Sequence, residues 1–131
     1  MPDPIIYVDQ SDVVADKLPQ LEAAIRELAD LVERTQPQLL AYRAHFSRDG
    51  RRMTIIHIHR DAGSLDTFTE AAGPAFGRFR DLVRLRRIDV YGQAAEPALE
   101  RLRDKARLLA GDGSPAVVEV HRSEAGFSRL R

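Results

Sequence analysis

The chain has 131 residues, with 20 basic and 20 acidic side chains and therefore no net charge at neutral pH. Its 44% hydrophobic and 31% charged content is typical of one folded globular domain. The balanced charge gives no global attraction to nucleic acid or to an anionic membrane, and the lack of cysteine excludes disulfides and thiolate sites. The N-terminus carries no secretory pattern and no apolar run has the length of a membrane span. We therefore expect a cytoplasmic protein that binds neither nucleic acid nor membrane.

The first part of the chain alternates between strand and helix signals. Residues 4–8 (PIIYV) are β-branched and aromatic, which favours a strand. A helix should follow, because apolar side chains recur at helical spacing at Leu18, Leu21, Ile25, Leu28 and Val32. Asp16 is the expected N-cap and Pro19 suits the first turn. Pro37 should end this helix near residue 36, because the residue before a proline disfavours helical geometry.

Residues 39–61 predict a β-hairpin whose turn is the dipeptide Asp49-Gly50. A two-residue turn at this dipeptide would place Tyr42 opposite His57. His57 and His59 are two residues apart, so both side chains should point to the same face of the sheet.

A second helical pattern covers residues 63–85, with Ser64 as a plausible N-cap. Its apolar stripe comprises Leu65, Phe68, Ala72, Phe76, Phe79 and Val83. We expect Gly73-Pro74 to break or kink this helix in the middle. Residues 86–92 (RRIDVYG) then predict a fourth strand.

The element order is β-α-β-β-α-β, which is the ferredoxin-like arrangement of an α+β subunit with an antiparallel sheet. A further amphipathic helix follows at Leu99, Leu102, Ala106 and Leu109, and residues 116–122 favour a fifth strand. We therefore expect a ferredoxin-like domain at residues 1–95. Residues 96–131 would be a helix and strand extension of the same domain.

Both faces of the predicted hairpin carry apolar side chains. Leu40, Tyr42, Ala44 and Phe46 form one row, whereas Ile56 and Ile58 form another on the third strand. Two helices cover one face of a four-stranded sheet, so the other face needs a second cover. A second copy of the chain would supply it, and we expect a homodimer.

The segment 57–79 (HIHRDAGSLDTFTEAAGPAFGRF) has a third-strand end followed by a helix with Gly73-Pro74, an Ala-Phe pair and Phe79. In these features, residues 4–92 resemble the antibiotic biosynthesis monooxygenase-like family of dimeric α+β barrels. The resemblance implies a homodimeric barrel with a ligand pocket between sheet and helices. It also implies an aromatic or polyketide-like substrate and an oxidation that uses no bound cofactor.

The resemblance associates cofactor-independent oxygenation with an Asn on the first strand, a Trp at the end of the third and a His on the second helix. This chain has no Asn and no Trp. Tyr7 lies near the expected Asn position and His59 near the expected Trp position. The expected His falls at Thr69–Glu70, so none of the three residues is present.

The two histidines of the third strand have three interpretations. They bind a metal if His45 joins them as a third ligand, which requires an odd number of turn residues. They are structural if they bond to the backbone or to Glu70, or if they lie exposed at a strand end. They are functional if they face a ligand pocket, since imidazole transfers protons near neutral pH.

The working hypothesis takes His59 and His57 as catalytic, with His59 orienting or deprotonating the substrate and His57 in support. Tyr7, Tyr42, Phe68 and Phe76 are the expected pocket residues, with no metal and no cofactor. The predicted function is a small-molecule-binding protein, acting as a monooxygenase-like enzyme. The alternative is a non-catalytic, ligand-binding or stress-related dimeric barrel.

Overall fold

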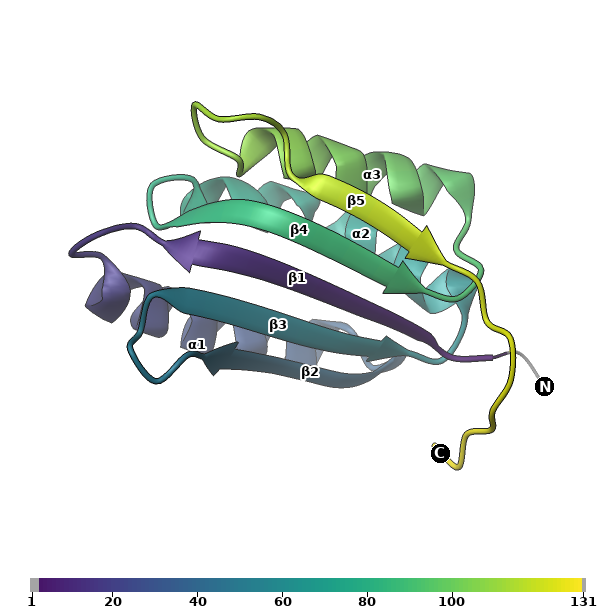
Figure 1. The fold of residues 1–131 in the computed structure, drawn as a ribbon. Coiled ribbons are helices and arrows are strands. Elements are labelled where there is room, and N and C mark those ends of the chain that lie inside the picture. The colour runs from purple at the N-terminus through teal and green to yellow at the C-terminus, as the bar shows by residue number, and fades with distance from the viewer. Residues whose placement is uncertain (1–2, 131) are drawn as a thin grey trace.

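The computed structural model describes residues 3–130 and has three helices on one face of a five-stranded sheet (Figure 1). The sheet order is β2-β3-β1-β4-β5. The elements are β1 (Ile5–Val13), α1 (Leu18–Thr35), β2 (Leu39–Phe46), β3 (Arg52–His59), α2 (Ala62–Phe76), the 3₁₀ turn η1 (Gly77–Phe79), β4 (Val83–Tyr91), α3 (Glu96–Leu108) and β5 (Val117–His121). Among the described residues, no helix is both long and apolar enough to cross a membrane. The predicted α+β, ferredoxin-like order is confirmed, with β1 to β4 antiparallel and β5 parallel to β4.

The hairpin between β2 and β3 has the predicted register, with Tyr42 opposite His57. Its loop is longer than expected, because the Ser47 N–H donates to the Arg52 carbonyl and residues 48–51 form the loop. Gly50 adopts φ +72°, a backbone conformation that glycine enters without a steric penalty. The loop has an even number of residues, so the register, and with it the face of each side chain, is the same as for a two-residue turn.

The start of α1 differs from the prediction. Asp16 is not the N-cap: it has φ +65°, and Lys17 occupies the cap position without a side-chain hydrogen bond. Pro19 lies in the first turn and the helix ends at Thr35, as the sequence predicts. The expected cap is wrong because Asp16 belongs to the tight turn that leaves β1, a strand that reaches Val13 rather than residue 8.

The limits of α2 also differ. Asp61, not Ser64, is the N-cap, and its carboxylate accepts the Ser64 N–H at 2.9 Å. Of the break or kink predicted at Gly73-Pro74, the break is wrong, because the helix continues through Pro74 to Phe76. Burial of the rings on either side of the proline, those of Phe68 and Phe76, offsets the one backbone hydrogen bond that proline removes.

The chain after η1 leaves the helix earlier than expected. The predicted helix extends to residue 85, whereas β4 begins at Val83. Val83 and Leu85 are buried and lie in register with β1. Their alternation fits a strand as well as a helical stripe, and pairing with β1 decides between the two.

The hydrophobic core lies between the sheet and the helices. Along β1, Ile5, Tyr7, Asp9 and Ser11 are buried on the helix-facing side. The apolar stripe of α3, including Ala98, Leu99, Leu102 and Ala106, belongs to the same core. The helix after residue 95 therefore covers part of the same sheet face as α1 and α2 (Figure 1).

The opposite face of the sheet carries a row of apolar side chains. Ile6 lies opposite Ile58, and Val8 lies opposite Ile56, on neighbouring strands. Ile6 and Tyr91 are 37% and 42% exposed. We call this surface, defined by Ile6, Val8, Ile56, Ile58 and Tyr91, the outer face.

Candidate functional site

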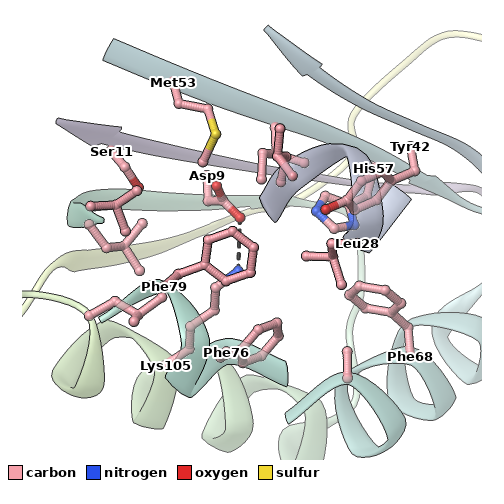
Figure 2. A pocket seen from close by; sticks show the side chains of 16 residues that line it. Asp9, Ser11, Leu28, Tyr42, Met53, His57, Phe68, Phe76, Phe79 and Lys105 are labelled. Carbon is pink, nitrogen blue, oxygen red and sulfur yellow. Dashed lines mark hydrogen bonds and ion pairs between the residues drawn. The ribbon is translucent and has the colours of Figure 1, made fainter. Parts of the chain in front are cut away.

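An internal cavity of about 30 Å³ lies between the sheet and the helices. The polar residues that line it are Asp9, Ser11, Tyr42, His57 and Lys105. Phenylalanine rings of α2 and η1 and aliphatic side chains form the rest of the wall (Figure 2). A buried water needs roughly 10–15 Å³ of this kind of space, so the cavity has room for about two waters.

His57 is the most unusual residue of this cavity. It is 2% exposed, and neither ring nitrogen has a hydrogen-bond partner within residues 3–130. Its ring stacks on Tyr7 with 4.2 Å between centroids and meets the edge of Tyr42 at 4.8 Å. An unpaired buried polar group costs about 1–3 kcal/mol, so two unpaired nitrogens are a marked departure from ordinary core packing.

Burial also fixes the charge of His57. Desolvation first, and then the nearby Lys105 and His59, lower its pKa well below the ordinary value. The imidazole is therefore neutral at pH 7. It presents one N–H donor and one lone-pair acceptor.

His59 lies on the same strand face but has a different environment. Its Nδ1 lies 2.8 Å from the Ser64 hydroxyl oxygen, and that hydroxyl is 3.4 Å from the Gln38 carbonyl. Burial lowers the pKa of His59 to about 4, although Asp61 acts in the opposite direction. Its side chain is fully buried beside Phe68 and is not among the residues that line the cavity.

A buried ion pair closes the other part of the cavity. Lys105 of α3 donates hydrogen bonds to Asp9 Oδ2 at 2.9 Å and to the Tyr7 hydroxyl at 2.6 Å (Figure 2 shows the pair with Asp9). The Tyr7 hydroxyl in turn donates to Asp9 Oδ2 at 3.1 Å. Burial, followed by the negative charge of Asp9, raises the pKa of Tyr7, so the phenol stays protonated.

Sequence analysis did not identify Asp9 and Lys105. Lys105 is one of only two lysines in the chain and occupies a position on the apolar stripe of α3, between Leu102 and Ala106. Asp9 occurs two residues after Tyr7, on the same strand face. A charged residue at a core position of the first strand and another at a core position of the last helix could therefore have indicated a buried ion pair.

The expected pocket residues surround His57, directly or through a neighbour. Tyr42, Phe68 and Phe76 line the cavity, whereas Tyr7 lies behind the His57 ring and reaches the ion pair through its hydroxyl. The Phe76 ring is 4.3 Å from Lys105 Nζ, a cation–π contact. Five of the six expected residues thus belong to one packed group around His57 and Lys105, and His59 contacts this group through Phe68.

The metal interpretation of the histidines required His45 on their side of the sheet. In the observed register His45 lies opposite Thr54, so it faces away from His57 and is exposed. His57 and His59 stack with 5.9 Å between ring centroids, and His59 uses Nδ1 for Ser64. This geometry does not bring three histidine ligands together.

A second polar cluster lies on the outer side of β4 and β5. Ligand atoms of Asp89, Glu119 and His121 lie within 4.8 Å of one another. Arg87 donates to both carboxylates, and its Nε is 2.8 Å from Asp89 Oδ2. Because the Arg87 guanidinium already bonds to both carboxylates, we assign the cluster to the pairing of β4 with β5.

Comparisons with known proteins identify the fold. No protein-family model matches the chain, and no curated protein matches its sequence. Among solved structures, MupZ from Pseudomonas fluorescens has a TM-score of 0.72 at 16% identity, and the match covers 98% of this chain and 91% of that one. A candidate antibiotic biosynthesis monooxygenase from Deinococcus radiodurans has a TM-score of 0.58 at 14% identity, with coverages of 70% and 93%. A candidate monooxygenase from Shewanella loihica has a TM-score of 0.51 at 21% identity, with coverages of 72% and 98%.

The chain therefore has the fold of the antibiotic biosynthesis monooxygenase-like proteins, as its sequence pattern predicts. The matches to the two candidate monooxygenases leave about three-tenths of this chain uncovered, whereas MupZ matches nearly all of it. At these identities the likeness concerns the fold, and the function must be argued from the cavity.

Proposed function

We propose that the chain is a small-molecule-binding protein whose ligand occupies the cavity between sheet and helices. The observation that carries this proposal is His57, whose two ring nitrogens lack partners among the described residues although the side chain is buried. Unpaired polar groups in an apolar wall are the usual means by which a ligand site fixes orientation. A bound hydroxyl or carbonyl would satisfy the nitrogens.

The finer proposal is a monooxygenase-like enzyme that acts on an aromatic or polyketide-like substrate and needs no bound cofactor. The neutral imidazole of His57 would accept a hydrogen bond from a phenol or enol hydroxyl and so orient the substrate, and the aromatic wall would hold the ring beside it. His59, bonded to Ser64 and outside the cavity lining, would support His57 by packing rather than contact the substrate. This exchanges the roles that the sequence-based hypothesis gave to the two histidines.

The volume of the cavity favours a second candidate function. Sites for drug-sized ligands occupy about 300–1,000 Å³, whereas this cavity measures about 30 Å³. A protein that holds a ligand only after its helices separate, or that assembles without catalysing a reaction, fits this volume. The second candidate is therefore a non-catalytic, ligand-binding or stress-related barrel.

We also propose that two cytoplasmic copies pack their outer faces together to form a homodimeric barrel. The helices cover only the inner face of the sheet (Figure 1). On the outer face, Ile6 and Tyr91 are exposed. Burying such an apolar surface is favourable by about 25 cal/mol per Å². Sheet-to-sheet packing between copies would supply the cover.

One experiment separates the enzyme from the binding protein. Phenolic and polyketide-like aromatics are titrated into the wild type and His57→Phe by calorimetry, and dioxygen uptake is followed with an oxygen electrode. Binding with uptake that His57→Phe abolishes supports the enzyme. Binding without uptake supports the non-catalytic, ligand-binding candidate. No binding to the wild type contradicts both ligand-binding proposals and leaves the stress-related barrel.

A further inference from the structure

The cavity contains a cation that the helix α3 contributes. The side chain of Lys105 is 8% exposed, and Lys105 lines the cavity together with its ion-pair partner Asp9. We propose that Lys105 is the ligand anchor of this cavity and that its ammonium donates a hydrogen bond to the carbonyl oxygen of a neutral ligand. This inference rests on the proposed function and specifies the class of compound that the site takes.

The first argument is the number of donors. An ammonium has three N–H groups, and within residues 3–130 Lys105 makes two hydrogen bonds, to Asp9 and to the Tyr7 hydroxyl. Its Nζ also lies 4.3 Å from the centroid of the Phe76 ring, which is a wall of the cavity. The third N–H has no hydrogen-bond acceptor among the described residues, and because Lys105 lines the cavity, a ligand oxygen there could accept it.

The second argument concerns charge. Asp9 and Lys105 form one carboxylate–ammonium pair at 2.9 Å, and no other charged side chain of residues 3–130 lines the cavity. The pair has no net charge, so an ionic ligand would lose its hydration without gaining an unpaired counter-charge. A neutral ligand with an acceptor oxygen avoids this penalty.

The third argument is the complementarity of the two polar groups. His57 stacks on one face of Tyr7, while Lys105 Nζ lies 5.2 Å from the centroid of the same ring. The cavity thus offers a charged donor at Lys105 and a neutral donor and acceptor at His57. A hydroxyketone, an enol or a phenol with a carbonyl substituent carries the matching oxygen atoms.

A buried ion pair is by itself weak evidence for a role in stability. Replacing a buried ion pair by apolar residues of similar volume is often neutral or stabilising, because both charges lose their hydration. The apolar stripe of α3 would pack on the sheet with a methionine at position 105. A ligand that accepts a hydrogen bond from the ammonium would explain why a lysine occupies position 105.

The test uses two probes of nearly equal shape, acetophenone and ethylbenzene, which differ in one carbonyl oxygen. Calorimetry measures both against the wild type and the neutral double variant Asp9→Asn/Lys105→Met. We expect the variant to bind acetophenone about tenfold or more weakly, the range of a hydrogen bond to a charged group, and ethylbenzene within about twofold of the wild type. Arg107→Met, an exposed change on the same helix, should alter neither affinity.

Infrared spectroscopy of acetophenone with a labelled carbonyl group tests the hydrogen bond in the wild-type protein, without a substitution. A hydrogen bond from Lys105 should lower the carbonyl stretching frequency in the wild-type complex relative to hexane. An unshifted frequency overturns the anchor, and so does an equal loss of affinity for both probes in the double variant. If neither probe binds the wild type, the proposed function fails and the anchor with it.

Discussion

At the residue scale, the buried polar side chains of the cavity differ in what satisfies them. Lys105 has Asp9 and Tyr7, whereas neither ring nitrogen of His57 has a partner among the described residues. His59, outside the cavity lining, uses Nδ1 for Ser64 and leaves only Nε2 unpaired. A residue kept for structure alone would gain from a partner or from an apolar replacement. Because of this difference, substitution of His57 is the most informative test of the ligand site.

We predict that His57→Phe leaves the free energy of unfolding unchanged or raises it by about 1 kcal/mol. The reason is that the substitution removes two unpaired nitrogens from a site surrounded by aromatic rings. The same change should abolish ligand binding. Chemical denaturation and calorimetry measure the two effects. His59→Phe is the matched control and should lower the free energy of unfolding by about 1 kcal/mol or more, since Ser64 loses its partner. A marked loss of stability in His57→Phe would identify that histidine as structural.

We predict that acid destabilises the protein through its buried histidines. The pKa of His59 is about 4 in the folded protein and near 6.5 in the unfolded chain. Between these values the unfolded chain binds more protons, so stability is full above pH 6.5 and decreases as the pH falls toward 4. His59 contributes up to about 1.4 kcal/mol per pH unit in this window, and the lowered pKa of His57 acts in the same direction.

Urea denaturation at a series of pH values tests this dependence. His59→Gln retains an amide that can bond to Ser64 and does not titrate, so its curve should be shallower than that of the wild type. His45→Gln changes an exposed histidine and should leave the curve unchanged. Identical curves for the wild type and His59→Gln would contradict the assigned pKa.

At the element scale, access to the cavity depends on α1 and on the end of α2. Leu28 and Phe79 line the cavity and also line a surface groove between these elements. Glu27 and Arg78 form an ion pair at 2.7 Å beside this groove. A cavity of about 30 Å³ admits an organic ligand only when such a wall separates.

We predict that Leu28→Ala accelerates ligand association, because it removes part of the wall that the groove and the cavity share. Leu31→Ala is the matched control, since Leu31 lies on the same helix and groove but is 41% exposed and does not line the cavity. Stopped-flow fluorescence with an aromatic ligand measures both association rates. Equal rates in the two variants would place the entrance elsewhere.

At the scale of the whole molecule, the two faces of the sheet are different surfaces. One face packs on three helices and encloses the cavity, whereas the outer face presents isoleucine, valine and tyrosine side chains. Exposed apolar surfaces of this kind mark interfaces between proteins. The proposed homodimer is therefore a property of the outer face, separate from the ligand site.

We predict that Ile58→Glu converts a dimer to a monomer, because it places a charge in the centre of the proposed sheet-to-sheet contact. Leu31→Glu introduces the same charge on the helical side and should leave the dimer intact. Light scattering after size-exclusion chromatography gives the mass of each species. A wild-type protein that remains monomeric at high concentration would exclude the barrel.

The sequence by itself determined the order of the elements, the register of the hairpin and the shared face of His57 and His59. These features follow from short-range rules, the periods of 2 and 3.6 and the even number of loop residues, which each segment carries within itself. It did not determine the limits of α2 and β4, because the same apolar spacing fits a helix until a neighbouring strand pairs with it.

Only the tertiary structure decided the chemistry of the cavity. Asp9 and Lys105 are 96 residues apart and meet because β1 and α3 pack on each other. Ser64 bonds to one ring nitrogen of His59, whereas both nitrogens of His57 lack a partner among the described residues, a distinction that identical residue types two positions apart cannot reveal. Periodicity fixes the direction of a side chain, but the atoms that meet it come from distant segments, and those contacts form only when the chain folds.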